Sequence, residues 1–168
     1  METFIIKKNK HYSNFLKIKL HILKKKIKYK IFFDESSQYD LKNNEQYDIN
    51  KLFGISYGFH HRNSARFGWR WDLAKNKIEI LAYVYSGGKR VNEWEQNIHI
   101  AYIDFFDFYE MEIQKNKNEY IFTLKKDSNK IVYRKSIKSN AKCFFGYELF
   151  PYFGGNRKAP HDISISFS

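Results

Sequence analysis

The residues with the most varied chemistry lie in one short stretch of the chain, residues 59–71, which reads FHHRNSARFGWRW. Its candidate ligand-binding residues are His60, His61, Asn63, Arg66 and Arg70. Arginine and asparagine provide directional hydrogen-bond donors, and histidine adds a group that can donate or accept. This combination is suited to binding a polyol.

Two tyrosines further along the chain, Tyr83 and Tyr85, complete the first candidate site. Tyrosine and tryptophan rings offer flat apolar faces with a polar end, against which the C–H groups of a sugar can pack. We therefore expect a face with Arg66, Arg70, Tyr83 and Tyr85 beside the loop over 60–63. The structural alternative is that Arg70 forms a cross-strand ion pair and the tyrosines are half-buried packing.

A second stretch, residues 147–162, contributes Asn156 and His161 as further candidate binding residues. Its glycine pair at 154–155 permits backbone conformations that other residues avoid, and Pro160 stiffens the approach to the last strand. The alternative is a tight connection between two core strands. The glycine pair is not a phosphate-binding loop, because the Lys-Ser/Thr ending is absent.

Metal and catalytic sites are poorly supported by the residue spacing. His60, His61, His161 and Asp162 could ligate a metal only if their two loops met, so we expect no metal and no cofactor. A polysaccharide lyase or hydrolase needs a His/Tyr pair or two facing carboxylates, and no spacing pairs them here. No catalytic residue is predicted.

The element that must position the first site is a hairpin. Ala65, Phe67, Trp69 and Trp71 alternate with polar residues, and after a turn over 72–77 an apolar alternation resumes over 78–84. Matching the apolar faces requires the numbers of opposed residues to have an odd sum, and we predict an antiparallel register with a sum of 149. A slip by two residues is the alternative, which would keep the faces and change the partners. This register puts Trp69 opposite Ile80 on the core face. It puts Arg66 opposite Tyr83, Arg70 opposite Glu79 and Ser64 opposite Tyr85 on the other.

Further short strands are predicted over residues 97–103, 106–113, 119–124, 130–135, 144–150 and 162–167. Turn residues over 86–89, 115–118 and 126–129 fit hairpin connections between neighbouring strands. The fold expected is all-β, a single-domain antiparallel β-sandwich of jelly-roll (concanavalin-like) type over residues 1–168, with ten or eleven short strands.

The N-terminal part is predicted to form a lysine-rich hairpin at about residues 1–33. Apolar residues alternate with lysines over 16–22 and again over 27–33, with a charged turn between them. A helix over 14–33 is the alternative, because leucine and lysine favour helices. Residues 34–51 are polar and are predicted to be a long loop.

The positive charge is concentrated in the same segment. The whole chain carries a net charge of +12. Residues 1–30 hold ten lysines against one glutamate, a net +9, and the remainder holds 20 basic and 17 acidic residues, a net +3. Residues 7–30 could attract an acidic partner or form a solvated lysine face. Nucleic acid is not the expected partner, because lysine outnumbers arginine 24 to 6 and the arginine fork suits phosphate and base recognition.

Composition excludes several classes of protein. With 168 residues, 43% hydrophobic and only two prolines, the chain can bury a core and is not disordered. The single cysteine excludes an internal disulfide framework. No apolar run is long enough for a membrane-spanning helix. The N-terminus has no secretion signal, so a cytoplasmic or virion-associated location is expected; the oligomeric state is left open.

Three stretches carry a resemblance to a group of small uncharacterised β-sandwich proteins from Bacteroidota and their phages. They are residues 51–71, residues 78–85 and residues 149–163, and the resemblance covers about residues 34–168. It implies a phage or mobile-element origin and transfers no functional residue.

The function expected is a non-enzymatic recognition module that binds carbohydrate or another surface ligand, a glycan or a protein surface, through its Arg/Tyr/His face. One alternative is a structural or accessory protein, such as a virion decoration subunit, that docks through its lysine-rich N-terminal hairpin. The other is a polysaccharide-active lyase or hydrolase with a histidine in the site.

Overall fold

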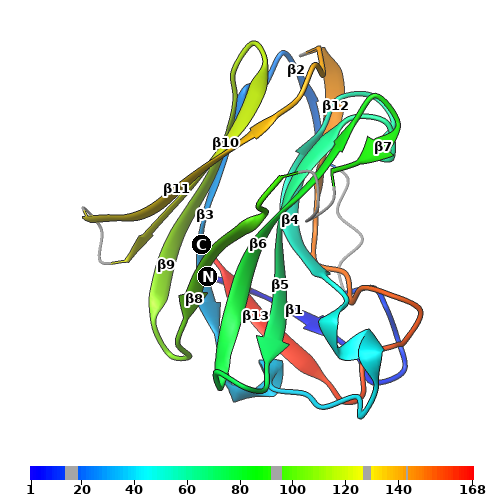
Figure 1. The fold of residues 1–168 in the computed structure, drawn as a ribbon, viewed down its shortest axis with the longest axis vertical. Coiled ribbons are helices and arrows are strands. Elements are labelled where there is room, and N and C mark those ends of the chain that lie inside the picture. Colours follow the sequence, from blue (N-terminus) through cyan, green and yellow to red (C-terminus); the bar gives the residue numbers. More distant parts are fainter. Residues whose placement is uncertain (14–18, 92–95, 127–129, 143) are drawn as a thin grey trace.

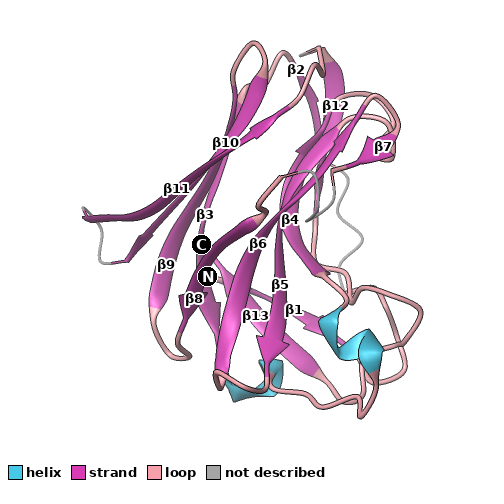
Figure 2. Ribbon diagram, in the orientation of Figure 1, coloured by secondary structure: helices cyan, strands magenta, loops and turns pink. Residues whose placement is uncertain are grey.

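The computed structural model describes residues 1–13, 19–91, 96–126, 130–142 and 144–168. Two antiparallel sheets face each other and enclose one aromatic-rich core between them (Figure 1). Within these ranges the only helices are two short 3-10 turns, η1 (Glu35–Ser37) and η2 (Asn44–Tyr47) (Figure 2). The protein is an antiparallel β-sandwich of jelly-roll type, as the sequence predicts.

The strands divide between a six-stranded and a seven-stranded sheet. The six-stranded sheet has the order β1 (Glu2–Ile6), β13 (Ile163–Phe167), β3 (Lys26–Phe33), β9 (Phe108–Lys115), β10 (Glu119–Lys126) and β11 (Lys130–Lys138). The seven-stranded sheet has the order β2 (Leu20–Ile22), β12 (Phe145–Leu149), β4 (Asn50–Ser56), β5 (Ser64–Asp72), β6 (Lys77–Ser86) and β7 (Lys89–Arg90), and β8 (His99–Ile103) also pairs with β6. Pairing of β1 with β13 brings the two termini close together (Figure 1).

The hairpin of β5 and β6 has the predicted register at every position. Trp69 pairs with Ile80, Arg66 with Tyr83 and Arg70 with Glu79. The apolar face is buried, with Phe67 and Trp69 fully enclosed. Period-2 alternation excludes a slip by one residue, which would send every apolar side chain to the opposite face, and the pairing observed is the predicted one rather than a slip by two.

The six further strands predicted from the sequence are all present, with ends shifted by up to three residues. The turns over 86–89 and 115–118 join paired strands, as expected. In the turn predicted over 126–129, residues 127–129 lie outside the described ranges, but the flanking strands β10 and β11 pair with each other. The loop predicted over 34–51 contains η1 and η2 and ends in β4. Three strands, β1, β4 and β7, were not predicted from the sequence.

The predicted N-terminal hairpin is wrong in its pairing. β2 pairs with β12 in one sheet, whereas β3 pairs with β9 and β13 in the other. The connection between β2 and β3 therefore crosses the sandwich, and Leu23 adopts a φ of 53° within it. The alternation misled here because Leu20 and Ile22 are 64% and 75% exposed, while His21 points inward. A helix is absent over 19–33, and residues 14–18 lie outside the described part.

Several lysines of this segment are neutralised within the fold. Lys28 Nζ lies 3.0 Å from Glu110 Oε2, and Lys26 Nζ lies 2.8 Å from Glu112 Oε2, both across the β3–β9 pair. Solvent screens such exposed cross-strand pairs, so each contributes little to stability. The outer surface of the six-stranded sheet therefore carries a mixed charge ladder rather than a purely basic face.

Candidate functional site

A hollow of about 610 Å³ lies against the seven-stranded sheet, on the side away from the core. Five tyrosines, two histidines and two cationic side chains dominate its lining. These residues are Tyr12, Tyr83, Tyr85, Tyr147, Tyr152, His60, His61, Lys51 and Arg66. We call this space the tyrosine hollow.

The pleat of β5 and β6 positions one wall of the tyrosine hollow. Because Phe67 and Ala82 point into the core, their neighbours Arg66 and Tyr83 point outward, directly opposite each other. The next outward position on β6 is Tyr85, and its ring centroid lies 5.9 Å from that of Tyr83. The sequence therefore predicted this wall from alternation alone.

A second wall comes from distant parts of the chain. Lys51, in β4, forms a β-bridge with Tyr152, and their backbones exchange hydrogen bonds of 2.8 and 2.9 Å. β12 lies beside β4 and supplies Tyr147. Pairing of strands about 90 residues apart thus completes the tyrosine hollow.

Arg66 is the most constrained cation of the tyrosine hollow. Its Nη2 donates to the carbonyl oxygen of Phe150, and its Nε is buried with no hydrogen-bond partner among the residues described. Gly54 makes this crossing possible, because a Cβ there would lie 2.5 Å from Arg66 Cγ. Burial lowers the pKa of Arg66 to about 10, so the guanidinium still carries its charge at neutral pH.

His60 and Tyr147 form a hydrogen-bonded pair in the tyrosine hollow. His60 Nδ1 lies 2.6 Å from the hydroxyl oxygen of Tyr147, and the adjacent His61 ring lies 4.2 Å from the His60 ring. Burial, followed by the charges of His61 and Arg66, lowers the pKa of His60 below its usual range. The imidazole of His60 is therefore neutral at pH 7 and able to accept a proton.

Lys51 lies among aromatic rings rather than carboxylates. Its Nζ is 4.9 Å from the ring centroid of Tyr83 and 5.6 Å from that of Tyr152. Burial lowers the pKa of Lys51 to about 8, and the neighbouring charges of Arg66 and Arg90 act in the same direction. The ammonium is thus held charged at pH 7 in surroundings that disfavour the charge.

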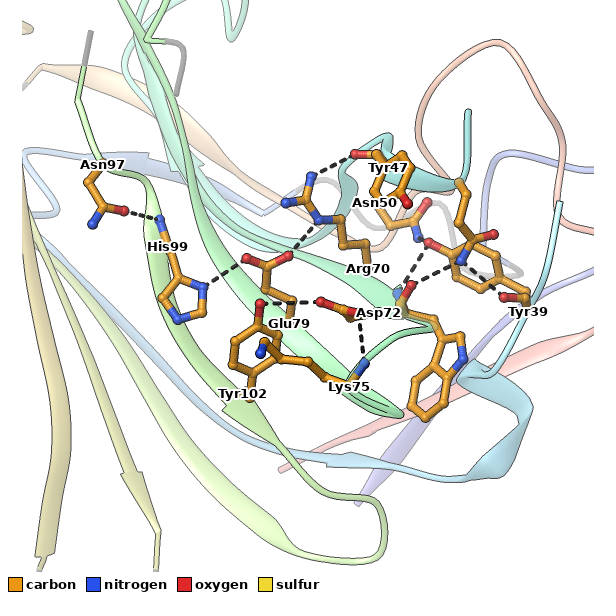
Figure 3. Close-up of polar contacts among 12 residues, drawn as sticks. Tyr39, Tyr47, Asn50, Arg70, Asp72, Lys75, Glu79, Asn97, His99 and Tyr102 are labelled. Carbon is orange, nitrogen blue, oxygen red and sulfur yellow. Dashed lines mark hydrogen bonds and ion pairs between the residues drawn. The ribbon is translucent and has the colours of Figure 1, made fainter. Parts of the chain in front are cut away.

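Arg70 lies outside the lining of the tyrosine hollow, in a separate polar network (Figure 3). Its Nε donates to Glu79 Oε2 at 2.6 Å, and its Nη1 donates to the carbonyl oxygen of Tyr47 at 2.8 Å. The other carboxylate oxygen of Glu79 contacts His99 Nδ1 at 2.8 Å. The geometry is that of the cross-strand ion pair considered as the structural alternative.

The other sequence candidates are dispersed around the molecule. Asn63 accepts a hydrogen bond from the backbone N–H of Gly87 and so braces the β6–β7 turn. Asn156 is exposed in the loop just after Gly155, which itself borders the tyrosine hollow. His161 Nε2 lies 2.8 Å from the carbonyl oxygen of Ser36, beside η1. The structure therefore brings together His60, His61, Arg66, Tyr83 and Tyr85, and leaves Asn63, Arg70, Asn156 and His161 elsewhere.

Sequence reasoning missed Lys51, Tyr12, Tyr147 and Tyr152 as members of the site. Tyr147 and Tyr152 lie in the second candidate stretch, so their residue type was an available signal, but Lys51 carried none. No group of three or more metal-ligating side chains is found among the described residues. In the same part of the chain, no helix has the length and hydropathy to cross a bilayer.

No family model matches this chain, and no curated protein matches it in sequence. Solved structures do resemble its fold. An alginate lyase from Klebsiella pneumoniae superposes with a TM-score of 0.61 at 12% identity, over 84% of this chain and 56% of that one. A functionally unknown protein from Saccharomyces cerevisiae superposes with a TM-score of 0.57 at 6% identity, over 90% of this chain and 71% of that one. A GH43 protein from Bacillus licheniformis superposes with a TM-score of 0.53 at 10% identity, over 96% of this chain and 28% of that one.

The chain thus spans about half the length of the alginate lyase and less than a third of the GH43 protein. At identities of 6–12% these likenesses concern the backbone arrangement alone. The arrangement they share with this chain is the jelly-roll β-sandwich.

Proposed function

We propose that this protein is a carbohydrate-recognition module that binds a saccharide in the tyrosine hollow. The observation that carries the proposal is the convergence of five tyrosine rings on a space of about 610 Å³ that also contains Arg66. Specific small-ligand sites combine apolar, often aromatic walls with a few placed polar groups. A sugar presents both C–H faces and hydroxyls, and so matches both kinds of lining.

Two further points support a sugar. The Arg66 guanidinium lines the tyrosine hollow and makes one hydrogen bond, from Nη2 to Phe150, so it has further N–H donors to offer to sugar hydroxyls. In addition, the alginate lyase and the GH43 protein, whose names point to polysaccharides, have a comparable fold, although this is analogy at the level of fold.

The test is a titration with a panel of oligosaccharides at physiological salt. Replacing Tyr83 by alanine removes one ring, and loss of a stacked aromatic contact of about 1 kcal/mol or more predicts at least a fivefold weaker affinity. Tyr133→Ala on β11 is the matched control, because that tyrosine is 43% exposed on the other sheet. The proposal fails if no saccharide binds, or if Tyr83→Ala and Tyr133→Ala bind equally well.

A second candidate is a polysaccharide lyase, favoured by the His60–Tyr147 pair. A neutral His60 could accept the proton next to a uronate carboxylate while Tyr147 donates to the departing glycosidic oxygen, so that a C–H and a C–O bond break and a C=C bond forms. A hydrolase with two facing carboxylates has less support. Glu148 is the one acidic residue in the lining as described, and its oxygens already accept from Lys24 and Tyr29.

The ultraviolet absorbance of the unsaturated product distinguishes the lyase from a binding module. An enzyme would generate that absorbance from a polyuronate and lose it in Tyr147→Phe. A binding module would retain its ligand unchanged.

Docking on an acidic partner through the lysine-rich segment is a weaker alternative. Lys24 contacts Glu148 at 2.6 Å, and the glutamates of β9 contact Lys26 and Lys28. These contacts reduce the charge available to a partner.

A further inference from the structure

The tyrosine hollow contains two cations whose charge the surrounding protein leaves unneutralised. Among the described residues, neither Lys51 nor Arg66 has a carboxylate within ion-pair distance. By contrast, the cations at Lys24, Lys28 and Arg70 are each paired with a glutamate. Unpaired cations are ordinary on an open surface, but these two lie in a recess lined by tyrosines.

The acidic residues nearest to the tyrosine hollow do not change this balance. Glu148 points its carboxylate toward Lys24 and the hydroxyl of Tyr29, with both oxygens at 2.6 Å from their donors. Asp48 lies under Gly155 and favours the charged form of Lys51, but less strongly than Arg66 and Arg90 disfavour it. On balance, the charged side chains around Lys51 therefore disfavour its ammonium form.

The hydrogen-bonding capacity of the two cations is also largely unused. Arg66 makes one hydrogen bond, from Nη2 to Phe150, and the Lys51 ammonium faces the rings of Tyr83 and Tyr152. Two like charges held close together in a partly desolvated recess disfavour each other, and an anion entering the recess relieves both. Hydrogen bonds to an ionised acceptor are about twice as strong as those between neutral groups.

We propose that the tyrosine hollow selects an acidic saccharide, with a carboxylate or sulfate of the sugar placed against Lys51 and Arg66. This inference rests on the proposed carbohydrate binding and adds the chemical class of the ligand. The aromatic walls would contact the sugar ring, and the two cations would discriminate acidic from neutral sugars.

The experiment measures affinities for matched pairs of oligosaccharides on the intact protein. One arm uses uronate oligosaccharides beside their carboxyl-reduced forms, which have the same stereochemistry without the charge. A second arm uses sulfated oligosaccharides beside their desulfated forms. We expect the acidic member of at least one arm to bind at least tenfold more tightly, because a hydrogen bond to a charged acceptor is stronger than one to a neutral hydroxyl. The arm that responds identifies the anion as carboxylate or sulfate.

Lys51→Met tests the role of the cation, because methionine retains much of the lysine stem. It should remove most of the acidic preference, measured as the ratio of the affinities for the acidic and the neutral member of each pair. Lys30→Met is the matched control, since Lys30 is exposed on β3 in the other sheet and the variant loses the same charge. A nonspecific effect of net charge would appear equally in both variants.

The outcomes separate this inference from the proposed function. Equal affinity for acidic and neutral members in both arms would overturn the inference and leave carbohydrate binding intact. An acidic preference that survives Lys51→Met, or is lost equally in Lys30→Met, would also overturn it. Absence of binding by every oligosaccharide would overturn both.

Discussion

Replacing Lys51 by methionine should make the free protein more stable at pH 7. Lys51 holds an ammonium group in the tyrosine hollow, against two tyrosine rings and near Arg66 and Arg90. Methionine fills a similar volume and places no charge there. The variant therefore removes an unfavourable charge while retaining most of the packing.

The magnitude follows from the pKa of the amine. A fall in the pKa of Lys51 from 10.5 to about 8 corresponds to a penalty of about 3 kcal/mol on the charged form in the folded state. Lys51 is partly exposed, and solvent screens some of this penalty. We expect the free energy of unfolding of Lys51→Met to exceed that of the wild type by about 1–3 kcal/mol at pH 7.

The same reasoning fixes the pH dependence. Between pH 8 and 10.5 the unfolded chain retains a proton on Lys51 that the folded chain has released, so wild-type stability rises with pH across this window. The advantage of Lys51→Met should therefore shrink by roughly half between pH 7 and pH 9.5. Below pH 8 the difference should stay constant, because Lys51 is charged in both states.

Urea denaturation of the wild type, Lys51→Met and Lys30→Met at pH 7 and 9.5 measures these differences. Taking the variant minus the wild type cancels the other groups that titrate in this range. Lys30→Met should match the wild type within about 0.5 kcal/mol at both pH values. If Lys51→Met were less stable at pH 7, or its advantage did not change with pH, the idea of a strained charge in the tyrosine hollow would be refuted.

Two further substitutions test the framework around the site. Glu79→Ala removes a buried carboxylate that contacts both Arg70 and His99. Its free energy of unfolding, measured in urea titrations at pH 7, should be about 2–4 kcal/mol lower than that of the wild type. A loss below about 0.5 kcal/mol would mean that the network contributes little. Gly54→Ala places a Cβ 2.2 Å from the carbonyl oxygen of Ala65, so β4 and β5 must move apart. Thermal melts should show a loss of stability of about 1–3 kcal/mol. An unchanged melting temperature would contradict the close approach of the two strands.

The fold was largely predictable where one strand face is apolar and the other polar. β5 and β6 have this alternation, and their register was correct at every position. β4 was not found, because six of its seven residues are buried and alternation disappears in a strand covered on both faces. The β2–β3 connection was misassigned because a lysine-rich stretch has the same pattern whether its strands pair with each other or lie in separate sheets.

The residues of the candidate site were likewise predictable only where a local pattern connects them. Arg66, Tyr83 and Tyr85 come from one hairpin, so local pattern placed them together. Lys51 and Tyr152 meet only through a bridge between residues about 100 positions apart. A single sequence contains no record of such long-range pairings, since many partners satisfy the same pattern.

The strict alternation of β5 and β6 has a consequence for how this protein can change over evolutionary time. On these two strands, every second side chain points into the core, as Phe67 and Ala82 do. The side chains between them point outward, and Tyr83 and Tyr85 among these line the tyrosine hollow. Substitutions at these outward positions leave the interior untouched, so new specificities are accessible by single exchanges without loss of folding. Arg66 is the exception: its bond to Phe150 ties it to the scaffold as well as to the hollow, and it should tolerate exchange least.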